Sequence, residues 1–452
     1  MKKSPNLLFS ILFALIIISC SSDPEVEQKK VVETPPPTVP IPDPIPEIEA
    51  KITAYSSNYG KPSEQITITG ENFSDKIENT KLYFDGIEAT IISATPTAIK
   101  FTLPATTNMI PQLRLVITNT KITNTVKNAY KGNIAILNAN PASSWIVSNS
   151  PTTNSRIIKI QILDNGSIYY NYEVTTALSG GSTISFNYVK RSLDGGKTWE
   201  TWAETASSFG GSLFFATNND EGWSIYGSAD LYKIPMGGVD KTKISSSVGW
   251  IVYMNVDETL KKGTIVNLKG GVYTTDDGTN FTKAYNSIES TNIGVNDAYY
   301  LDNDHIWAYG YRGATVSGSF NYVPFIMYKK SSSDNWQEKI FMDKDAQIST
   351  IQFFKDNSGL ILMSSSVDAK ILKSNDGGDN WSEIYKGEKF TNMTFIDPNN
   401  GWAVLKEKIY KTTDGGVSWT LDYTNDEEIL KIASKDKFVI AISKSKIIKR
   451  YL

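Results

Sequence analysis

The pattern of apolar and polar residues predicts short β-strands along most of the chain. Between residues 51 and 130, apolar and polar positions alternate over segments such as 66–70 and 113–117, as they do in strands with one buried face. From residue 144 onward, short apolar and aromatic runs are separated by turns rich in Asp, Asn and Gly. We therefore expect an all-β protein with a smaller domain at 51–130 and a larger one at 144–452.

One phrase recurs four times in the larger segment, with the pattern Ser/Thr-x-Asp-x-Gly-x-x-aromatic. Each copy lies between two short apolar runs, which predicts a strand, a tight turn and a second strand. The Asp can accept hydrogen bonds from turn amides, the Gly permits a positive φ, and the aromatic ring packs back over the hairpin. These structural roles are assigned to Ser192, Asp194, Gly196, Trp199, Asp276, Gly278, Phe281, Asp376, Gly378, Trp381, Asp414, Gly416 and Trp419.

The repeated phrase resembles the Asp-box, or BNR repeat, found in β-propellers of sialidases, sortilin-type receptors and photosystem II assembly factors. The resemblance covers residues 144–452 and implies a propeller, in which the acids of the phrase hold turns on the rim. A second phrase, Gly-Trp after a polar turn, recurs at Gly222-Trp223 and Gly401-Trp402. Together the two phrases indicate six blades between residues 156 and 423.

The C-terminal segment decides the predicted number of blades. Residues 429–451 supply three apolar runs, one strand fewer than a blade needs. A propeller must close, because open sheet edges invite aggregation, and residues 145–148 could supply the missing outer strand. We favour seven blades, with six as the alternative.

The smaller domain carries two phrases of its own, Ile68-Thr-Gly-Glu-Asn-Phe73 and Phe84-Asp-Gly-Ile-Glu-Ala89. They resemble the IPT/TIG domain, an immunoglobulin-like β-sandwich, over the whole of 51–130. The Asp-Gly pair in the second phrase is typical of a hairpin bend. The resemblance implies a spacer or docking module and no catalytic role.

The N-terminus has the features of an export signal. Lys2 and Lys3 precede an apolar run over 7–18, too short for a stable membrane span. The run ends at Ile17-Ile-Ser-Cys20, which resembles a bacterial lipobox and implies a signal peptide at 1–19 and an acylated, for example palmitate-bearing, Cys20. Cys20 is the single cysteine, so lipidation would leave no thiol for a disulfide or a metal. The alternative is a chance cysteine at the end of a signal sequence or of a membrane anchor.

A proline-rich tether follows at 20–50. Eight prolines between residues 23 and 50 favour extended polyproline II, which could reach roughly 80 Å. Ser21-Ser-Asp-Pro-Glu25 resembles the surface-export tag of Bacteroidetes lipoproteins, with an ordinary solvated linker as the alternative. We expect an outer-membrane lipoprotein, held to the membrane by its N-terminal lipid and exposed at the cell surface.

Charge and metal-binding patterns narrow the choice of ligands. The formal net charge is −3 and no basic stripe is present, so nucleic acid is not an expected partner. Oxygen ligands lie close together at 218–221 and 302–304, but neither segment has the EF-hand spacing, so solvated turns are favoured over Ca²⁺. No cofactor is expected, and the single histidine, His305, is interpreted as a surface turn residue.

The Asp-box raises the hypothesis of a sialidase, and the sequence disfavours it. That resemblance requires three arginines around a substrate carboxylate, a Tyr-Glu pair and a Phe-Arg-Ile-Pro phrase. The best candidate here is Ser155-Arg156-Ile-Ile158, which lacks the flanking Phe and Pro. Another glycosidase or a lyase stays open and predicts two acids converging at the central channel.

Aromatic residues give the binding hypothesis. Because the apolar face of a sugar ring packs on an aromatic ring, exposed Tyr clusters suit a glycan, although packing between blades is the alternative for each. The proposed ligand-lining residues are Tyr170, Tyr172, Tyr300, Tyr309, Tyr311 and Arg312. We expect a non-catalytic surface binding protein whose propeller engages an extracellular glycan or protein. A polysaccharide-degrading enzyme and an assembly scaffold for an envelope protein are the alternatives.

Overall fold

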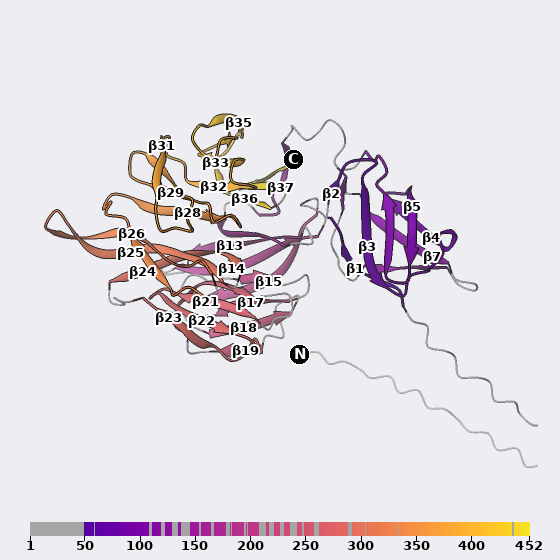
Figure 1. Cartoon of the computed structure of the whole chain (residues 1–452), viewed down its shortest axis with the longest axis horizontal. Coiled ribbons are helices and arrows are strands. Elements are labelled where there is room, and N and C mark those ends of the chain that lie inside the picture. The colour runs from indigo at the N-terminus through magenta and orange to yellow at the C-terminus, as the bar shows by residue number, and fades with distance from the viewer. Residues whose placement is uncertain are drawn as a thin grey trace, which may run out of the picture. The chain divides into compact units, whose positions relative to one another are not determined.

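The structure is a computed structural model of the whole chain (Figure 1). It describes residues 49–452 except for 58, 108–110, 119–122, 129–133, 137–144, 153–154, 164–166, 178–180, 182, 194–195, 197, 208–213, 217–220, 227–229, 236–241, 246–247, 257–261, 288–291, 303, 332 and 436–437. The predicted signal peptide, Cys20, most of the tether, Asp194 and most of the 218–221 segment lie outside the described residues. Within the described part, no helix has the length and apolar character needed to span a membrane.

The smaller domain is a β-sandwich. Its strands follow the order β8-β7-β4-β5-β6-β3-β1-β9, with a separate β10-β2 pair. The elements are β1 (Lys51–Tyr55), β2 (Tyr59–Gly60), β3 (Gln65–Glu71), the 3-10 helix η1 (Ile77–Asn79), β4 (Thr80–Phe84), β5 (Ile87–Thr95), β6 (Ala98–Thr102), β7 (Leu113–Thr118), β8 (Thr123–Thr125), β9 (Lys127–Asn128) and β10 (Ala135–Ile136).

Alternation along these strands builds the core of the sandwich. In β3 the buried residues Ile66 and Ile68 alternate with more exposed neighbours, as the sequence predicted. The start of β5 pairs with β4 and the rest of it pairs with β6, so this one strand belongs to both halves of the sandwich. Asp85 and Gly86 both have a positive φ at the β4–β5 bend, which is the backbone that a tight hairpin requires.

The larger domain is a β-propeller built from four-stranded antiparallel sheets. Within the described residues there are seven such sheets, the arrangement favoured over six. In chain order the first three sheets are β12 (Arg156–Ile162), β13 (Ile168–Ala177), β14 (Thr183–Ser192) and β15 (Glu200–Ser207); β16 (Phe214–Ala216), β17 (Glu221–Tyr226), β18 (Asp230–Pro235) and β19 (Thr242–Ser245); and β20 (Ile251–Val256), β21 (Gly263–Asn267), β22 (Gly271–Thr275) and β23 (Thr282–Asn286).

Three further sheets continue the same order of strands, and the seventh combines the two ends of the domain. They are β24 (Ile293–Asp302), β25 (His305–Val316), β26 (Ser319–Lys329) and β27 (Gln337–Ile340); β28 (Gln347–Phe353), β29 (Gly359–Ser364), β30 (Ala369–Ser374) and β31 (Ser382–Gly387); β32 (Asn392–Phe395), β33 (Gly401–Leu405), β34 (Lys408–Thr412) and β35 (Thr420–Thr424); and β11 (Ile146–Asn149) with β36 (Ile429–Lys435), β37 (Phe438–Ser443) and β38 (Lys446–Tyr451).

The seventh sheet closes the ring with a strand from the start of the domain. β11 pairs antiparallel with β38, with Ile146 opposite Lys449 and Asn149 opposite Lys446. The closing strand predicted at 145–148 is therefore present, shifted by one residue. It removes the open edge that β38 would otherwise present.

The first strand of each sheet lies at the centre of the ring. β20 contacts β24, β24 contacts β28, β28 contacts β32, β32 contacts β36, and β36 contacts β12. The Gln161 side chain bonds the backbone of Ala216 in the second sheet, and the rings of Phe215 and Tyr253 meet between the second and third sheets. These links join every neighbouring pair of sheets, so the first strands surround one central channel.

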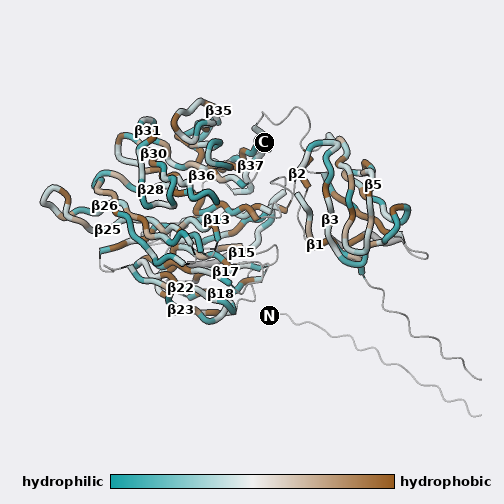
Figure 2. The backbone as a smooth tube through the Cα atoms, in the orientation of Figure 1, coloured by the Kyte–Doolittle hydropathy of each residue, from teal (hydrophilic) through white to brown (hydrophobic). Residues whose placement is uncertain are grey.

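Large aromatic side chains fill the spaces between sheets. Trp307 stacks on Phe353 of the next sheet, with ring centroids 3.9 Å apart. Trp202, Trp223 and Trp402 are likewise fully buried. Figure 2 shows brown, hydrophobic segments along the strands, with teal, hydrophilic segments concentrated at the connections. Burial of the apolar rings therefore holds the sheets together.

Candidate functional site

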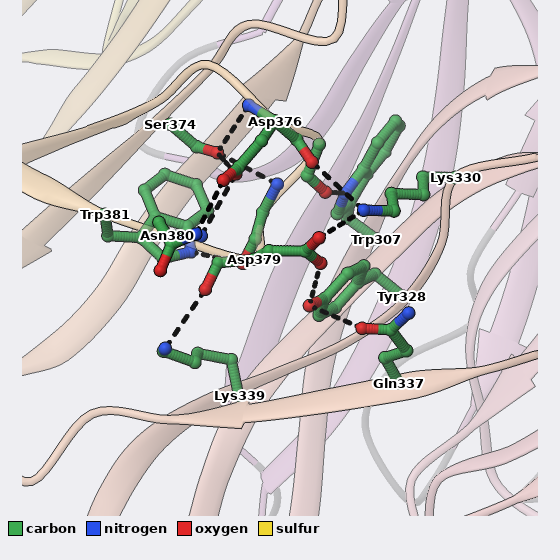
Figure 3. A network of polar contacts seen from close by, with 12 residues as sticks. Trp307, Tyr328, Lys330, Gln337, Lys339, Ser374, Asp376, Asp379, Asn380 and Trp381 are labelled. Atoms are coloured by element: carbon green, nitrogen blue, oxygen red, sulfur yellow. Dashed lines mark hydrogen bonds and ion pairs between the residues drawn. The ribbon is translucent and has the colours of Figure 1, made fainter.

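The Asp-box acids hold turns at the ends of the third strands. Asp376 accepts hydrogen bonds from the Ser374 hydroxyl at 2.8 Å, the Asn380 backbone N–H at 3.0 Å and the Asn380 side-chain amide at 2.8 Å (Figure 3). Gly378 has a φ of +110°, and Trp381 donates its ring N–H to the Gly378 carbonyl. The Asp376 carboxylate is engaged in hydrogen bonds within its own turn, which suits a structural role better than catalysis.

This turn is also bound to the preceding sheet. Asp379 accepts a hydrogen bond from Tyr328 at 2.8 Å and pairs with Lys330 (Figure 3). Lys339 donates to the Asp379 carbonyl, and Trp307 donates to the Gly377 carbonyl at 2.8 Å. The network of polar contacts therefore joins β25–β27 to the turn after β30.

Asp414 repeats the arrangement in the sixth sheet. It accepts hydrogen bonds from the Thr412 hydroxyl at 2.7 Å and the Ser418 hydroxyl at 2.5 Å, and its Oδ1 also accepts the Ser418 backbone N–H. Trp419 donates to the Gly416 carbonyl at 3.0 Å. In the first sheet, the Gly196 N–H donates to the Ser192 hydroxyl, and Trp199 packs on Tyr170.

The third sheet corrects one assignment, because Asp277 holds the turn rather than Asp276. The Asp277 carboxylate accepts the Thr275 hydroxyl and the backbone N–H groups of Thr279 and Asn280. The Gly278 N–H donates to a hydroxyl three residues earlier, whereas the corresponding Gly378 N–H reaches four residues back. The turn is one residue shorter, which moves the acid by one position. Phe281 packs on Trp223 as the aromatic residue of the repeat.

Three of the tyrosines proposed as ligand-lining residues are buried, and their burial corrects that assignment. Tyr170 is 0% exposed, lies beside Trp199 and bonds Thr152, and its burial raises the pKa of its hydroxyl. Tyr172 stacks on Tyr188 at 5.2 Å. Tyr309 is 8% exposed in the cluster between the fourth and fifth sheets. Their rings pack within the fold and have no open face for a ligand.

Tyr300 and Arg312 also face protein groups. Tyr300 is half-buried against the core between the third and fourth sheets. Arg312 is buried and pairs with the carboxylate of Glu338, which also accepts hydrogen bonds from Ser287 and Tyr285. Because Glu338 already occupies the guanidinium, Arg312 is not placed to line a ligand site.

Tyr311 alone among the six proposed residues is exposed, and two residues that the sequence analysis missed lie beside it. Tyr311, Phe320 and Tyr322 are 41%, 58% and 53% exposed. The Tyr322 ring lies edge-on to Tyr311 at 5.4 Å and to Phe320 at 5.6 Å. These three residues are named here the aromatic face.

The aromatic face lies on the long hairpin of β25 and β26, which extends beyond the neighbouring strands (Figure 1). Directly opposed residues of an antiparallel pair share one side of the sheet. Tyr322 opposes Gly313 and Phe320 opposes Thr315, which places both rings on the side of Tyr311. β24 begins at Ile293 opposite Arg312 and β27 pairs only from Phe325 onward, so the tip of the hairpin has two strands.

Two glycines allow the rings to lie close to the backbone. A Cβ at Gly294 would come within 2.2 Å of the Tyr311 ring, and a Cβ at Gly313 within 2.5 Å of the Phe320 ring. Glycine at these two positions therefore leaves room for the Tyr311 and Phe320 rings beside the backbone of β24 and β25. The signal that could have identified Phe320 and Tyr322 is their spacing of two on one strand, which places both side chains on one face.

The chemistry of this surface is apolar and neutral. Residues 313–324 contain no Asp, Glu, Lys or Arg, and the residues around the rings are Gly, Ser, Thr and Asn. Among the described residues, no group of three or more His, Cys, Asp or Glu could hold a metal ion. His305 makes a 2.6 Å contact with Asp302 at the other end of β25.

Comparisons with known proteins identify the family of the sandwich. Residues 50–134 match the IPT/TIG domain family, so the sandwich is an IPT/TIG domain. No curated protein sequence matches the chain.

Solved structures resemble the chain at low sequence identity. One described as YCF48 bound to D1 peptide is 16% identical with a TM-score of 0.49, over 70% of this chain and 96% of that one. An auxiliary nutrient binding protein from Bacteroides thetaiotaomicron is 12% identical with a TM-score of 0.36, over 90% and 99%. Another from Bacteroides ovatus is 9% identical with a TM-score of 0.36, over 90% and 98%.

Proposed function

We propose that this protein is a non-catalytic binding protein of a bacterial envelope, and that its aromatic face binds an uncharged extracellular glycan. The observation that carries the proposal is the exposure of Tyr311, Phe320 and Tyr322 together on one side of a projecting hairpin. Large exposed aromatic clusters are unusual on soluble proteins unless a ligand covers them.

A neutral glycan fits this surface better than a charged ligand. The C–H face of a pyranose packs on an aromatic ring, and three neighbouring rings offer contacts to successive sugars. The absence of charged residues from 313–324 leaves no partner for a phosphate, a carboxylate or an ammonium group. Thr315, opposite Phe320, supplies a hydroxyl that can exchange hydrogen bonds with sugar hydroxyls.

The channel supports binding over hydrolysis. A glycosidase needs two carboxyl groups about 5 to 10 Å apart around the scissile bond. In the described parts of the first strands the acids are Asp297 and Asp302, and Asp302 is bound to His305 at the end of β24. Asp297 therefore has no second carboxylate beside it on those strands.

The proposal includes anchoring to the outer membrane through lipid on Cys20, with the IPT/TIG domain and the tether as spacers. Its support is the lipobox-like sequence and the proline-rich segment that follows it. Metabolic labelling with a palmitate analogue should mark the wild-type chain and leave a Cys20→Ser variant unlabelled. Equal labelling of both chains would refute this assignment.

Binding is tested with a panel of neutral and acidic polysaccharides by affinity electrophoresis of the full chain, with sugar release measured in the same samples. We expect retardation by a neutral polysaccharide without products, and its loss in a Tyr311→Ser, Phe320→Ser, Tyr322→Ser triple variant. Trp250→Ala is the matched control, because Trp250 is 59% exposed outside the hairpin.

Each outcome separates the alternatives. Sugar release by the wild-type chain would make the protein an enzyme. Retardation that survives in the triple variant would move the glycan site away from the hairpin. If no polysaccharide binds, a protein partner that is captured by the wild-type chain and lost by the triple variant would replace the glycan as ligand.

A further inference from the structure

The channel of the propeller contains a charged ring built by a repeated backbone irregularity. Five of the first strands carry one extra residue at the same place in their pairing with the second strand. A bulge of this kind re-aims the side chain that follows it. The residues that follow the five bulges are Lys159, Tyr253, Asp297, Thr350 and Lys431.

Contacts between distant sheets show that the side chains of Lys159, Tyr253 and Asp297 point toward the centre of the ring. The Lys159 Nζ atom lies 3.7 Å from an Asp297 oxygen and 4.5 Å from the centre of the Tyr253 ring. Lys159 belongs to the first sheet and Asp297 to the fourth, with two sheets between them. Side chains of such sheets can meet only across the centre of the ring.

The ring has more positive than negative charge. Lys159 pairs with Asp297, Lys431 follows the bulge of β36 beside β12, and Arg156 at the start of β12 pairs with Glu173. Burial lowers the pKa of Lys431, Arg156 and Lys159 lower it further, and the Asp297 carboxylate acts in the opposite direction. One positive charge in the channel is therefore left without a compensating acid among the described residues of the ring.

Lys159 also keeps hydrogen-bonding capacity. Its Nζ atom is buried and donates no hydrogen bond within the described residues, although the ammonium group has three donors. The contact with Asp297 is longer than a hydrogen bond, and the Tyr253 and Phe215 rings cover other sides of the group. A buried donor in this state favours an acceptor that arrives with a ligand.

We propose that the central channel binds one carboxylate group of a ligand between Lys159 and Lys431. A monoanion matches the single uncompensated charge, and its two oxygens can accept hydrogen bonds from both ammonium groups. This site shares no residue with the aromatic face and does not depend on glycan binding there.

Isothermal titration of the full chain in mild detergent tests the site with acetate and with glucuronate, at constant chloride and with glucose as the uncharged control. Lys431→Met keeps most of the side-chain length and should weaken carboxylate binding about tenfold or more. Asp297→Asn should tighten it at least about fivefold, because the variant removes the competing negative charge. Lys344→Met, at an exposed lysine outside the ring, should leave it unchanged.

The Asp297→Asn variant distinguishes a specific effect on the site from misfolding, because a misfolded site would not gain affinity for carboxylates. Tighter binding of glucuronate than of acetate would identify a sugar acid as the ligand, and equal binding would identify a small free carboxylate. The proposal is overturned if neither carboxylate binds the wild-type chain, if glucose binds as well as glucuronate, or if Asp297→Asn fails to tighten binding.

Discussion

At the scale of single residues, carboxylates set the geometry of the tight turns. Hydrogen bonds from the backbone and side chain of Asn380 lower the pKa of Asp376 from 3.8 to about 2. Hydrogen bonds from the side chain and backbone of Ser418 lower the pKa of Asp414 to about 2. A carboxylate with this many donors stays ionised because each donor favours the charged form. The depressed pKa values are therefore a consequence of a structural role.

The first prediction separates the two neighbouring acids of the third sheet. Asp277→Ala removes the acceptor of two backbone N–H groups and of the Thr275 hydroxyl, so it should lower the midpoint of thermal unfolding. Asp276→Ala, the matched control, should lower it distinctly less. Circular dichroism melts of the two variants measure the difference. Equal midpoints would contradict the assignment of the turn-holding role to Asp277 rather than Asp276.

The second prediction concerns acid. A carboxylate whose pKa is lowered in the folded state stabilises the fold above its unfolded pKa, and this contribution is lost as pH falls toward the folded value. A double Asp376→Asn, Asp414→Asn variant should therefore be less stable than wild type at pH 5, and the difference should shrink to near zero by about pH 2. Urea unfolding at several pH values measures it. A difference that is constant with pH would contradict the assignment.

At the scale of elements, close approach of backbone and rings shapes the β24–β26 sheet. Gly294 and Gly310 lie next to each other in the ladder but face different obstacles. A Cβ at Gly310 would come within 2.0 Å of the Gly294 carbonyl oxygen, which is backbone. A Cβ at Gly294 would meet the outer end of the exposed Tyr311 ring, which can swing toward solvent.

The third prediction uses this contrast. Gly310→Ala should destabilise the protein by about 2 kcal/mol, because the strands must separate to admit the methyl group. Gly294→Ala should leave stability nearly unchanged while it displaces Tyr311 and weakens polysaccharide retardation. Urea unfolding and affinity electrophoresis of both variants distinguish the two effects. If Gly294→Ala retains full retardation, the ring of Tyr311 is not part of the glycan site.

At the scale of the whole molecule, the ring depends on contacts that join its last sheet to its neighbours. Asp422 on β35 accepts hydrogen bonds from Arg450 of β38 at 2.7 Å, from Trp145 beside β11 at 3.1 Å and from Trp402 of β33 at 3.0 Å. One carboxylate thus connects the sixth sheet to both contributors of the closing sheet.

The fourth prediction tests this closure. Asp422→Ala removes the acceptor of three mostly buried donors and should lower the free energy of unfolding by about 2–3 kcal/mol. Asp426→Ala, which removes an ion pair with Lys446 at the surface, should have little effect and serves as the control. Urea unfolding provides the comparison. Similar losses in both variants would show that Asp422 has no special part in closing the ring.

Part of this architecture was predictable because it is encoded locally. The turn phrases determine hydrogen bonds between residues at most four apart, and alternation in segments such as 66–70 follows directly from the geometry of a strand. The need for a fourth strand in the last sheet correctly identified the segment at β11 as the closing strand. The same local signal failed at Asp276, because the length of a turn depends on a backbone path that the motif does not specify.

Exposure of aromatic side chains could not be predicted in this way. The first half of β13 is buried on both sides, so Tyr169 and Tyr170 are both covered although they point in opposite directions and pack in different clusters. A strand between two neighbouring sheets has no exposed face, and its tyrosines resemble those of a binding platform in sequence. On β26, Tyr322 is exposed because the hairpin extends past the neighbouring strands.

The sequence by itself determined the all-β fold, the two domains and the tight turns, because short-range hydrogen bonding and the alternation of burial are properties of neighbouring residues. Only the tertiary structure decided which rings form the aromatic face and which charges meet in the channel. Lys159, Asp297 and Lys431 are far apart in the chain, and their proximity arises from closing seven sheets into one ring. Contacts of that kind depend on how whole elements pack, and a local sequence pattern therefore cannot predict them.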